Sequence, residues 1–148
     1  MPTRTARTTW TGGLQDGSGT VALVSSGVGS YEVSFPKRAA DDAGGTTSPE
    51  ELIAAAHTSC FAMQFSAQLG AAGGTGQSID VSGDVTLSPD QSGGLRISGI
   101  TLTVSGSAGG ISPEEFSKIA QEAKSACPVS KALAGTDITL QVTGADAG

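Results

Sequence analysis

SPEELIAAAHTSCFAMQFSAQL, residues 48–69, decides the fold because it has the marks of the longest helix in the chain. Ser48 can act as the N-cap, Pro49 suits the first helical position, and Glu51 completes a capping box. From Leu52 to Leu69 there is no formal charge, and apolar residues cover more than one face. Such a helix must be enclosed on most sides, so we expect it to be wrapped by sheet or by a partner chain.

A transmembrane helix is the first alternative for this uncharged run. A spanning segment needs about 20 predominantly apolar residues, and polar side chains interrupt this one. They are His57, Thr58, Ser59, Gln64, Ser66 and Gln68. The sequence therefore predicts a buried helix and no membrane span.

The composition restricts the classes of partner. The 148 residues suit one domain, 1–148, with a sizeable core. The net charge is −6 and the basic residues are scattered, which predicts no nucleic-acid or membrane partner. The first residues, MPTRTARTTWTGG, lack the apolar region of a secretory signal. We therefore expect a cytoplasmic protein, in which two cysteines are free or redox-active rather than a structural disulfide.

Periodicity predicts six strands and two or three helices. The predicted strands are Arg4–Thr11, Thr20–Ser26, Ser30–Phe35, Ile79–Leu87, Leu95–Val104 and Asp137–Thr143. A second capped helix is expected over Ser112–Ala126 and a short helical turn over Val129–Ala134. Pro36 should end the third strand and open a polar loop. The order β-β-β-α-β-β-α-(α)-β, with strands and helices in separate blocks, indicates an α+β fold.

The two cysteines, Cys60 and Cys127, are the candidates for chemistry. A Cys60 thiolate would need a nearby cation, because the helix dipole fades within the first turn. His57, one turn earlier, is better interpreted as packing, since a neutral imidazole supplies no charge. Arg38 enters from the preceding loop, and Glu50 could hold its guanidinium by a bidentate contact.

Cys127 sits in a different electrostatic setting. It lies at the end of the second long helix, and Pro128 disfavours continuation of that helix. The partial negative charge of a helix C-terminus disfavours a thiolate. This position suits a resolving thiol better than an attacking one.

The segments around the two cysteines are the most distinctive in the chain. TSPEELIAAAHTSCFAMQFS, followed by SACPVSKALAG, strongly resembles the osmotically inducible protein C and organic hydroperoxide resistance (OsmC/Ohr) family. The resemblance extends over nearly the whole chain. The HxxCF form and the SKALAG segment are closer to the OsmC branch.

This resemblance implies a function and a site. It implies an OsmC-like fold with a long buried central helix, in an intertwined homodimer with active sites at the interface. It implies a cysteine-based, peroxiredoxin-like antioxidant peroxidase of the stress response that reduces organic hydroperoxides, and hydrogen peroxide less efficiently, without metal or cofactor. Cys60 would be peroxidatic and Cys127 resolving through a Cys60–Cys127 disulfide, with Arg38 and Glu50 completing the site. An external dithiol, possibly a lipoyl group, would be the reductant.

Other readings of the same residues are open. The disulfide could switch a binding module without catalytic turnover. A metal site built from His57, Cys60 and Cys127 would lack the spaced cysteine pairs of structural zinc sites. A cysteine–histidine hydrolase would place a base and an orienting group against the thiol, and the only histidine lies on the helix of the nucleophile itself.

Overall fold

The computed structural model describes residues 1–145 and divides the chain into two compact units. The N-terminal unit is Met1–Leu52 and the C-terminal unit is Ile53–Gly148. A single domain over 1–148 stays a prediction. No helix in the described part of the chain is long and apolar enough for a membrane span.

The N-terminal unit is built on a three-stranded antiparallel sheet. Its strands are β1 (Arg7–Thr11), β2 (Ser18–Ala22) and β3 (Ser30–Val33), in the order β1-β2-β3. The three predicted strands are confirmed with shorter bounds. Only Val21 of this sheet is buried, whereas Trp10 and Tyr31 remain exposed. The sheet therefore presents aromatic surface that its own unit does not cover.

The segment after β3 differs from its prediction. A polar loop was expected beyond Pro36, but Phe35–Arg38 forms a short helix, α1. The Ser34 hydroxyl accepts a hydrogen bond from the backbone N–H of Lys37 (3.4 Å), and Pro36 has the fixed backbone angle that suits a first helical turn. The N-cap at Ser34 ends the strand early and places Arg38 in the last turn of α1.

The predicted long helix is confirmed as α2 (Pro49–Ala71). The Ser48 hydroxyl accepts from the backbone N–H of Glu51 (3.1 Å), as an N-cap should. The buried residues within the C-terminal unit recur one turn apart, at His57, Phe61, Phe65 and Leu69. The opposite side is exposed and carries small residues and one methionine: Ala55, Ala56, Ser59, Met63 and Ala67. The chain by itself therefore covers one face of the helix, and enclosure of the opposite face by a partner chain stays a prediction.

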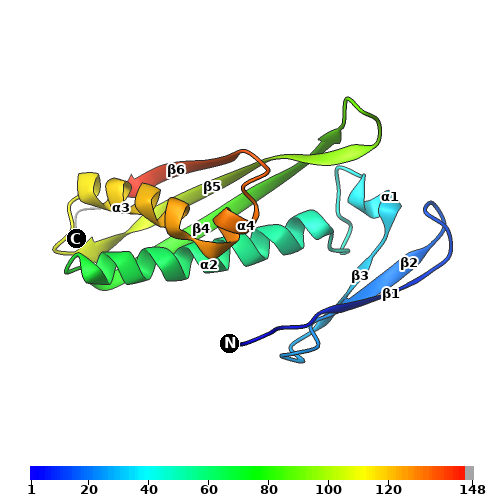
Figure 1. Ribbon diagram of the computed structural model, residues 1–148, viewed down its shortest axis with the longest axis horizontal. Helices are drawn as coiled ribbons and strands as arrows, with labels where there is room; N and C mark the ends of the chain where they lie inside the picture. The colour runs from blue at the N-terminus through cyan, green and yellow to red at the C-terminus, as the bar shows by residue number, and fades with distance from the viewer. Residues whose placement is uncertain (146–148) are drawn as a thin grey trace. The chain divides into compact units, whose positions relative to one another are not determined.

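The C-terminal unit contains the second sheet, β4 (Thr75–Pro89), β5 (Leu95–Gly109) and β6 (Ile138–Ala145). β4 and β5 form the predicted antiparallel hairpin, although both strands are longer than expected. β6 pairs with β5 in parallel. A parallel neighbour requires a crossover connection, and α3 (Pro113–Ala126) and α4 (Pro128–Ala132) supply it. Figure 1 shows α2 and α3 running along this sheet.

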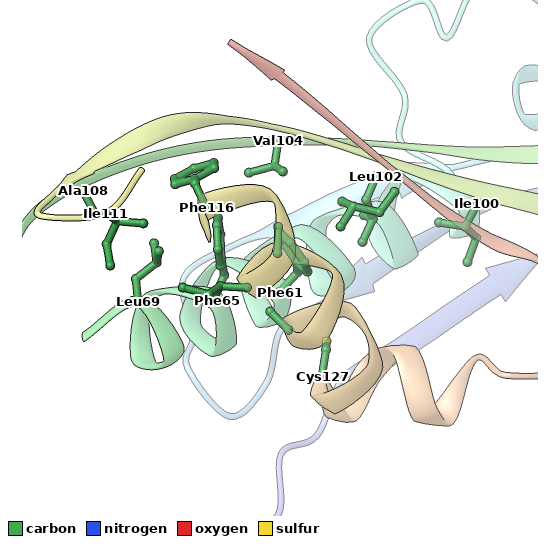
Figure 2. Packing of buried hydrophobic residues seen from close by; sticks show 14 residues of the cluster. Phe61, Phe65, Leu69, Ile100, Leu102, Val104, Ala108, Ile111, Phe116 and Cys127 are labelled. Carbon is green, nitrogen blue, oxygen red and sulfur yellow. The ribbon is translucent and has the colours of Figure 1, made fainter. Parts of the chain in front are cut away.

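The core of the C-terminal unit lies between these helices and one face of β5. Alternate residues Ile100, Leu102 and Val104 of β5 are buried against side chains of α2 and α3. Phe65 of α2 meets Phe116 of α3 edge to face, with ring centroids 4.8 Å apart (Figure 2). The core therefore fixes α2 and α3 against the same sheet face.

Two local features set this packing. The predicted capping box of α3 is confirmed, because Ser112 and Glu115 exchange both hydrogen bonds. Gly83 of β4 lets α2 approach closely, since a Cβ atom there would lie 2.9 Å from Cγ2 of Thr58.

Candidate active site

The fold brings the two cysteines together. Cys60 lies in the middle of α2 and is half-buried, whereas Cys127 joins α3 to α4 and is fully buried. Both thiols are free, and their side chains are close enough for each to shift the pKa of the other. Cys127 belongs to the core cluster and lies along its lower edge in Figure 2. The number of residues between the cysteines gave no indication of this contact, which depends on how α3 packs against α2.

The surroundings of Cys60 within its own unit favour the protonated thiol. Burial raises its pKa, and contact with Cys127 raises it further, although the backbone N–H of Val129 acts in the opposite direction. A thiolate at this position would therefore need a positive group from outside the residues that surround the sulfur here.

The surroundings of Cys127 act the other way. Burial alone would raise its pKa, but the polar hydrogens of Ser130, the Cys60 thiol and the backbone N–H of Val129 together lower it. The direction of this shift is opposite to the one expected from a helix C-terminus alone. Cys127 ends α3 but also directly precedes α4. The Cys127 side chain makes no capping hydrogen bond to the backbone of α4.

The N-terminal unit contains the predicted arginine–glutamate pair. Nε of Arg38 donates to both carboxylate oxygens of Glu50 at 3.1 Å, and Nη2 donates to Oε1 at 2.6 Å. Burial alone would raise the pKa of Glu50, but the Arg38 hydrogen bonds and charge, its own backbone N–H and the Ser48 hydroxyl lower it. The same contact raises the pKa of Arg38. The bidentate geometry expected for these two residues is confirmed.

Arg38 also lines an apolar pocket of about 270 Å³ within the N-terminal unit. The other lining residues are Trp10, Leu14, Val33, Ser34, Phe35, Thr47 and Pro49. The guanidinium is the one charged group among these lining residues, most of which are apolar. The four predicted site residues thus form two pairs, one in each unit, and a role for Arg38 at the Cys60 sulfur stays a prediction.

Two further polar residues lie beside the thiols. His57 is fully buried, and its Nε2 lies 2.7 Å from Oγ of Ser130. Burial lowers the pKa of His57, which favours the neutral imidazole. Sequence reasoning treated His57 as packing and missed Ser130. The available signal was the spacing, because His57 precedes Cys60 by one helical turn and Ser130 follows Cys127 by one.

The positions of these side chains bear on the alternative of a metal site at His57, Cys60 and Cys127. Among residues 1–145, no three histidine, cysteine, aspartate or glutamate side chains are grouped so as to hold a metal ion. The one histidine directs Nε2 to a serine hydroxyl. The chemistry that the residues in contact can perform is therefore that of two thiols next to a buried polar pair.

Fold and site together define an α+β protein in which a long helix holds one cysteine against a second cysteine at a helix junction. The chain belongs to the OsmC-like protein family, whose match covers residues 41–143. The predicted family is thereby confirmed. The chain is also 40% identical to peroxiredoxin OsmC of Escherichia coli over 131 residues, which cover 88% of this chain and 89% of that protein.

Solved structures agree with this assignment. The organic hydroperoxide resistance protein OhrB of Bacillus subtilis is 29% identical, with a TM-score of 0.73 and coverage of 94% of this chain and 98% of that one. An organic hydroperoxide resistance protein of Elizabethkingia anophelis is 28% identical, with a TM-score of 0.72 and 97% coverage of both chains. The predicted OsmC-like α+β fold is confirmed, and these relatives support a peroxidase-type function.

Proposed function

We propose that the chain is a thiol-dependent peroxidase that reduces organic hydroperoxides to alcohols, and hydrogen peroxide less efficiently. The observation that carries the proposal is the contact between the free thiols of Cys60 and Cys127. Two neighbouring thiols can be oxidised together to a disulfide and reduced again by thiol–disulfide exchange. The names of the relatives supply the substrate class, since two of them are organic hydroperoxide resistance proteins.

In the first step, the Cys60 thiolate attacks the distal peroxide oxygen. The O–O bond breaks, an alcohol leaves, and Cys60 becomes a sulfenic acid. Cys60 is the better candidate for this attack because it is half-buried and reachable, whereas Cys127 is fully buried. Its own surroundings raise its pKa, so the attack needs a cation.

We assign that cation to Arg38. Its guanidinium would favour the Cys60 thiolate and offset the negative charge that develops on the peroxide oxygens. Glu50 would act by orienting Arg38 through the bidentate contact. The apolar pocket that Arg38 lines would suit the hydrocarbon part of an organic hydroperoxide better than it would suit hydrogen peroxide.

In the second step, Cys127 attacks the sulfenic acid, a disulfide forms and water is released. An external dithiol, possibly a lipoyl group, then reduces the disulfide by exchange. No bound metal or cofactor takes part in the proposed cycle. We expect the protein to be located in the cytoplasm, where such dithiols are kept reduced.

We further propose that the chain works as a homodimer with the active sites at the interface. Two surfaces support this. The exposed side of α2 in the C-terminal unit is formed by alanines, Ser59 and Met63, and Met63 is 72% exposed. The sheet of the N-terminal unit leaves Trp10 and Tyr31 exposed. Apolar surface of this kind is typical of contact with another chain.

The test is turnover of cumene hydroperoxide with dithiothreitol as reductant. The unaltered chain should consume many equivalents of peroxide per chain, and Cys60→Ser should abolish that consumption. Ser125→Ala, at an exposed position on α3, is the control and should retain full activity. Consumption that stops after one equivalent per chain would favour a redox-switched binding module. Activity retained by Cys60→Ser would contradict the assignment.

A further inference from the structure

A buried polar pair connects α2 to α4 beside the thiols. His57 is fully buried and Ser130 is 8% exposed, and Nε2 of the imidazole lies 2.7 Å from the serine hydroxyl oxygen. A buried polar pair costs free energy unless its hydrogen bonds are satisfied. Its position beside two cysteines, rather than elsewhere in the core, calls for a chemical explanation.

The tautomer of His57 follows from its other nitrogen. Nδ1 is buried and has no hydrogen-bond partner among the described residues. A buried N–H without a partner is rarer in proteins than an acceptor without one. The neutral imidazole therefore keeps Nδ1 unprotonated and carries its hydrogen on Nε2. In that tautomer Nε2–H donates to Ser130, and the serine hydroxyl hydrogen is free to point elsewhere.

The available acceptor for that hydrogen is the Cys127 sulfur. Ser130 lies one turn after Cys127 in α4, and its backbone N–H and hydroxyl are among the groups that lower the pKa of Cys127. The hydrogen-bonded pair of His57 and Ser130 thus lies directly beside Cys127, which in turn neighbours Cys60. Donors that face a sulfur favour its anionic form.

We propose that His57 and Ser130 are positioning residues for the resolving step, in which they hold Cys127 ready to attack the oxidised Cys60. This inference rests on the proposed peroxidase function. His57 acts through Ser130 and touches neither sulfur in this role. It orients the hydroxyl, and the hydroxyl stabilises the thiolate of Cys127 as that sulfur becomes a nucleophile.

The step balances without any further reactant. The Cys127 thiolate attacks the sulfenic sulfur of Cys60, a sulfur–sulfur bond forms and the sulfur–oxygen bond breaks. Hydroxide leaves and takes up the proton that Cys127 gave up, so the products are the disulfide and water. The Cys127 sulfur is oxidised and the Cys60 sulfur is reduced.

The first experiment measures the Cys127 thiolate without peroxide. In a Cys60→Ser background, the ultraviolet absorbance of the Cys127 thiolate is followed as pH is varied. The midpoint of this titration gives the pKa of Cys127. Ser130→Ala should raise this pKa by about one unit. At a pH below the pKa, the fraction of Cys127 present as thiolate should then fall about tenfold. Ser130→Thr, which keeps the hydroxyl, should restore the pKa. His57→Phe should raise it and His57→Gln, which keeps an N–H donor, should restore it in part.

The second experiment separates the two chemical steps in a single turnover. Ser130→Ala should leave the rate of sulfenic acid formation at Cys60 unchanged and should slow disulfide formation about threefold. The loss is smaller than the loss of thiolate because a thiolate of higher pKa is a stronger nucleophile. Ser125→Ala is the matched control, since Ser125 is exposed and bonds to Gln121 on α3. It should change neither step.

The outcomes distinguish the inference from the proposed function. If the unaltered protein fails to turn over peroxide, the proposed function fails. The thiolate titration still tests whether His57 and Ser130 stabilise the Cys127 thiolate. If Ser130→Ala lowers thermal stability but leaves the Cys127 pKa unchanged, the pair only joins two helices and the inference is overturned. Equal slowing of both chemical steps would overturn it as well.

Discussion

Arg38 and Glu50 are joined by a bidentate ion pair in which Nη2 lies 2.6 Å from Oε1 and Nε lies 3.1 Å from both carboxylate oxygens. The pair links the last turn of α1 to the first turn of α2. Because the guanidinium is planar, two anchored donors fix its orientation. Glu50 thus fixes the orientation of the Arg38 guanidinium more firmly than a single contact would. Substitution of either residue tests this relationship.

The first prediction concerns stability as a function of pH. The folded chain lowers the pKa of Glu50 below its usual value, so the ionised pair stabilises the fold above the unfolded pKa. That contribution is lost as pH falls through the lowered pKa. Glu50→Gln should therefore be less stable than the unaltered chain at pH 7, with the difference shrinking below about pH 4. Urea unfolding at both pH values measures this; a difference that grows in acid would contradict it.

The second prediction concerns the cation of the attacking thiol. Arg38→Ala should raise the pKa of the Cys60 thiol and slow its reaction with cumene hydroperoxide. Iodoacetamide alkylation in a Cys127→Ser background, followed over pH, measures that pKa. Lys37→Ala is the control on the same short helix and should leave the profile unchanged. An identical profile for Arg38→Ala and the parent would remove Arg38 from the mechanism.

The third prediction concerns the resolving cysteine. Without Cys127, a sulfenic acid at Cys60 has no thiol in contact with it, and further oxidation competes. Cys127→Ser should consume about one equivalent of peroxide and then gain oxygen as sulfinic and sulfonic acid. Intact-mass measurement after a peroxide excess follows the added oxygens. Continued turnover at the rate of the unaltered chain would show that Cys127 is not needed.

The fourth prediction concerns assembly. Met63→Glu places a charge on the exposed side of α2, where a partner chain would have to bury it. The unaltered chain should sediment at twice its own mass, and Met63→Glu should shift it toward the monomer. Gln121→Glu on the exposed side of α3 is the matched control and should not change the mass. Sedimentation of the unaltered chain as a monomer would contradict the proposed dimer.

Local sequence signals predicted the elements well where caps and periodicity agreed. Ser48 and Ser112 marked both long helices, and alternation marked the β4–β5 hairpin. Phe35–Arg38 was missed because the proline was interpreted only as the end of a strand, although proline also suits a first helical turn. The ends of β4 and β5 extended into glycine-containing segments, where strand pairing overrides propensity.

The site was only partly accessible from the sequence. The Arg38–Glu50 contact followed from charge and from the entry of the loop into the helix, and the structure confirms it. The lowering of the Cys127 pKa by groups that include Ser130 could not follow from local patterns, because α4 begins directly at the cysteine. The partner of His57 likewise depends on how α4 packs against α2.

The central claim is that peroxide oxidation joins Cys60 to Cys127. The most direct measurement is a mass spectrum of the reduced chain after one equivalent of cumene hydroperoxide, followed by peptide mapping without reductant. The account predicts the loss of two hydrogen atoms and a linked pair of peptides containing Cys60 and Cys127. An unchanged mass, or oxygen added at either cysteine without linked peptides, would contradict it.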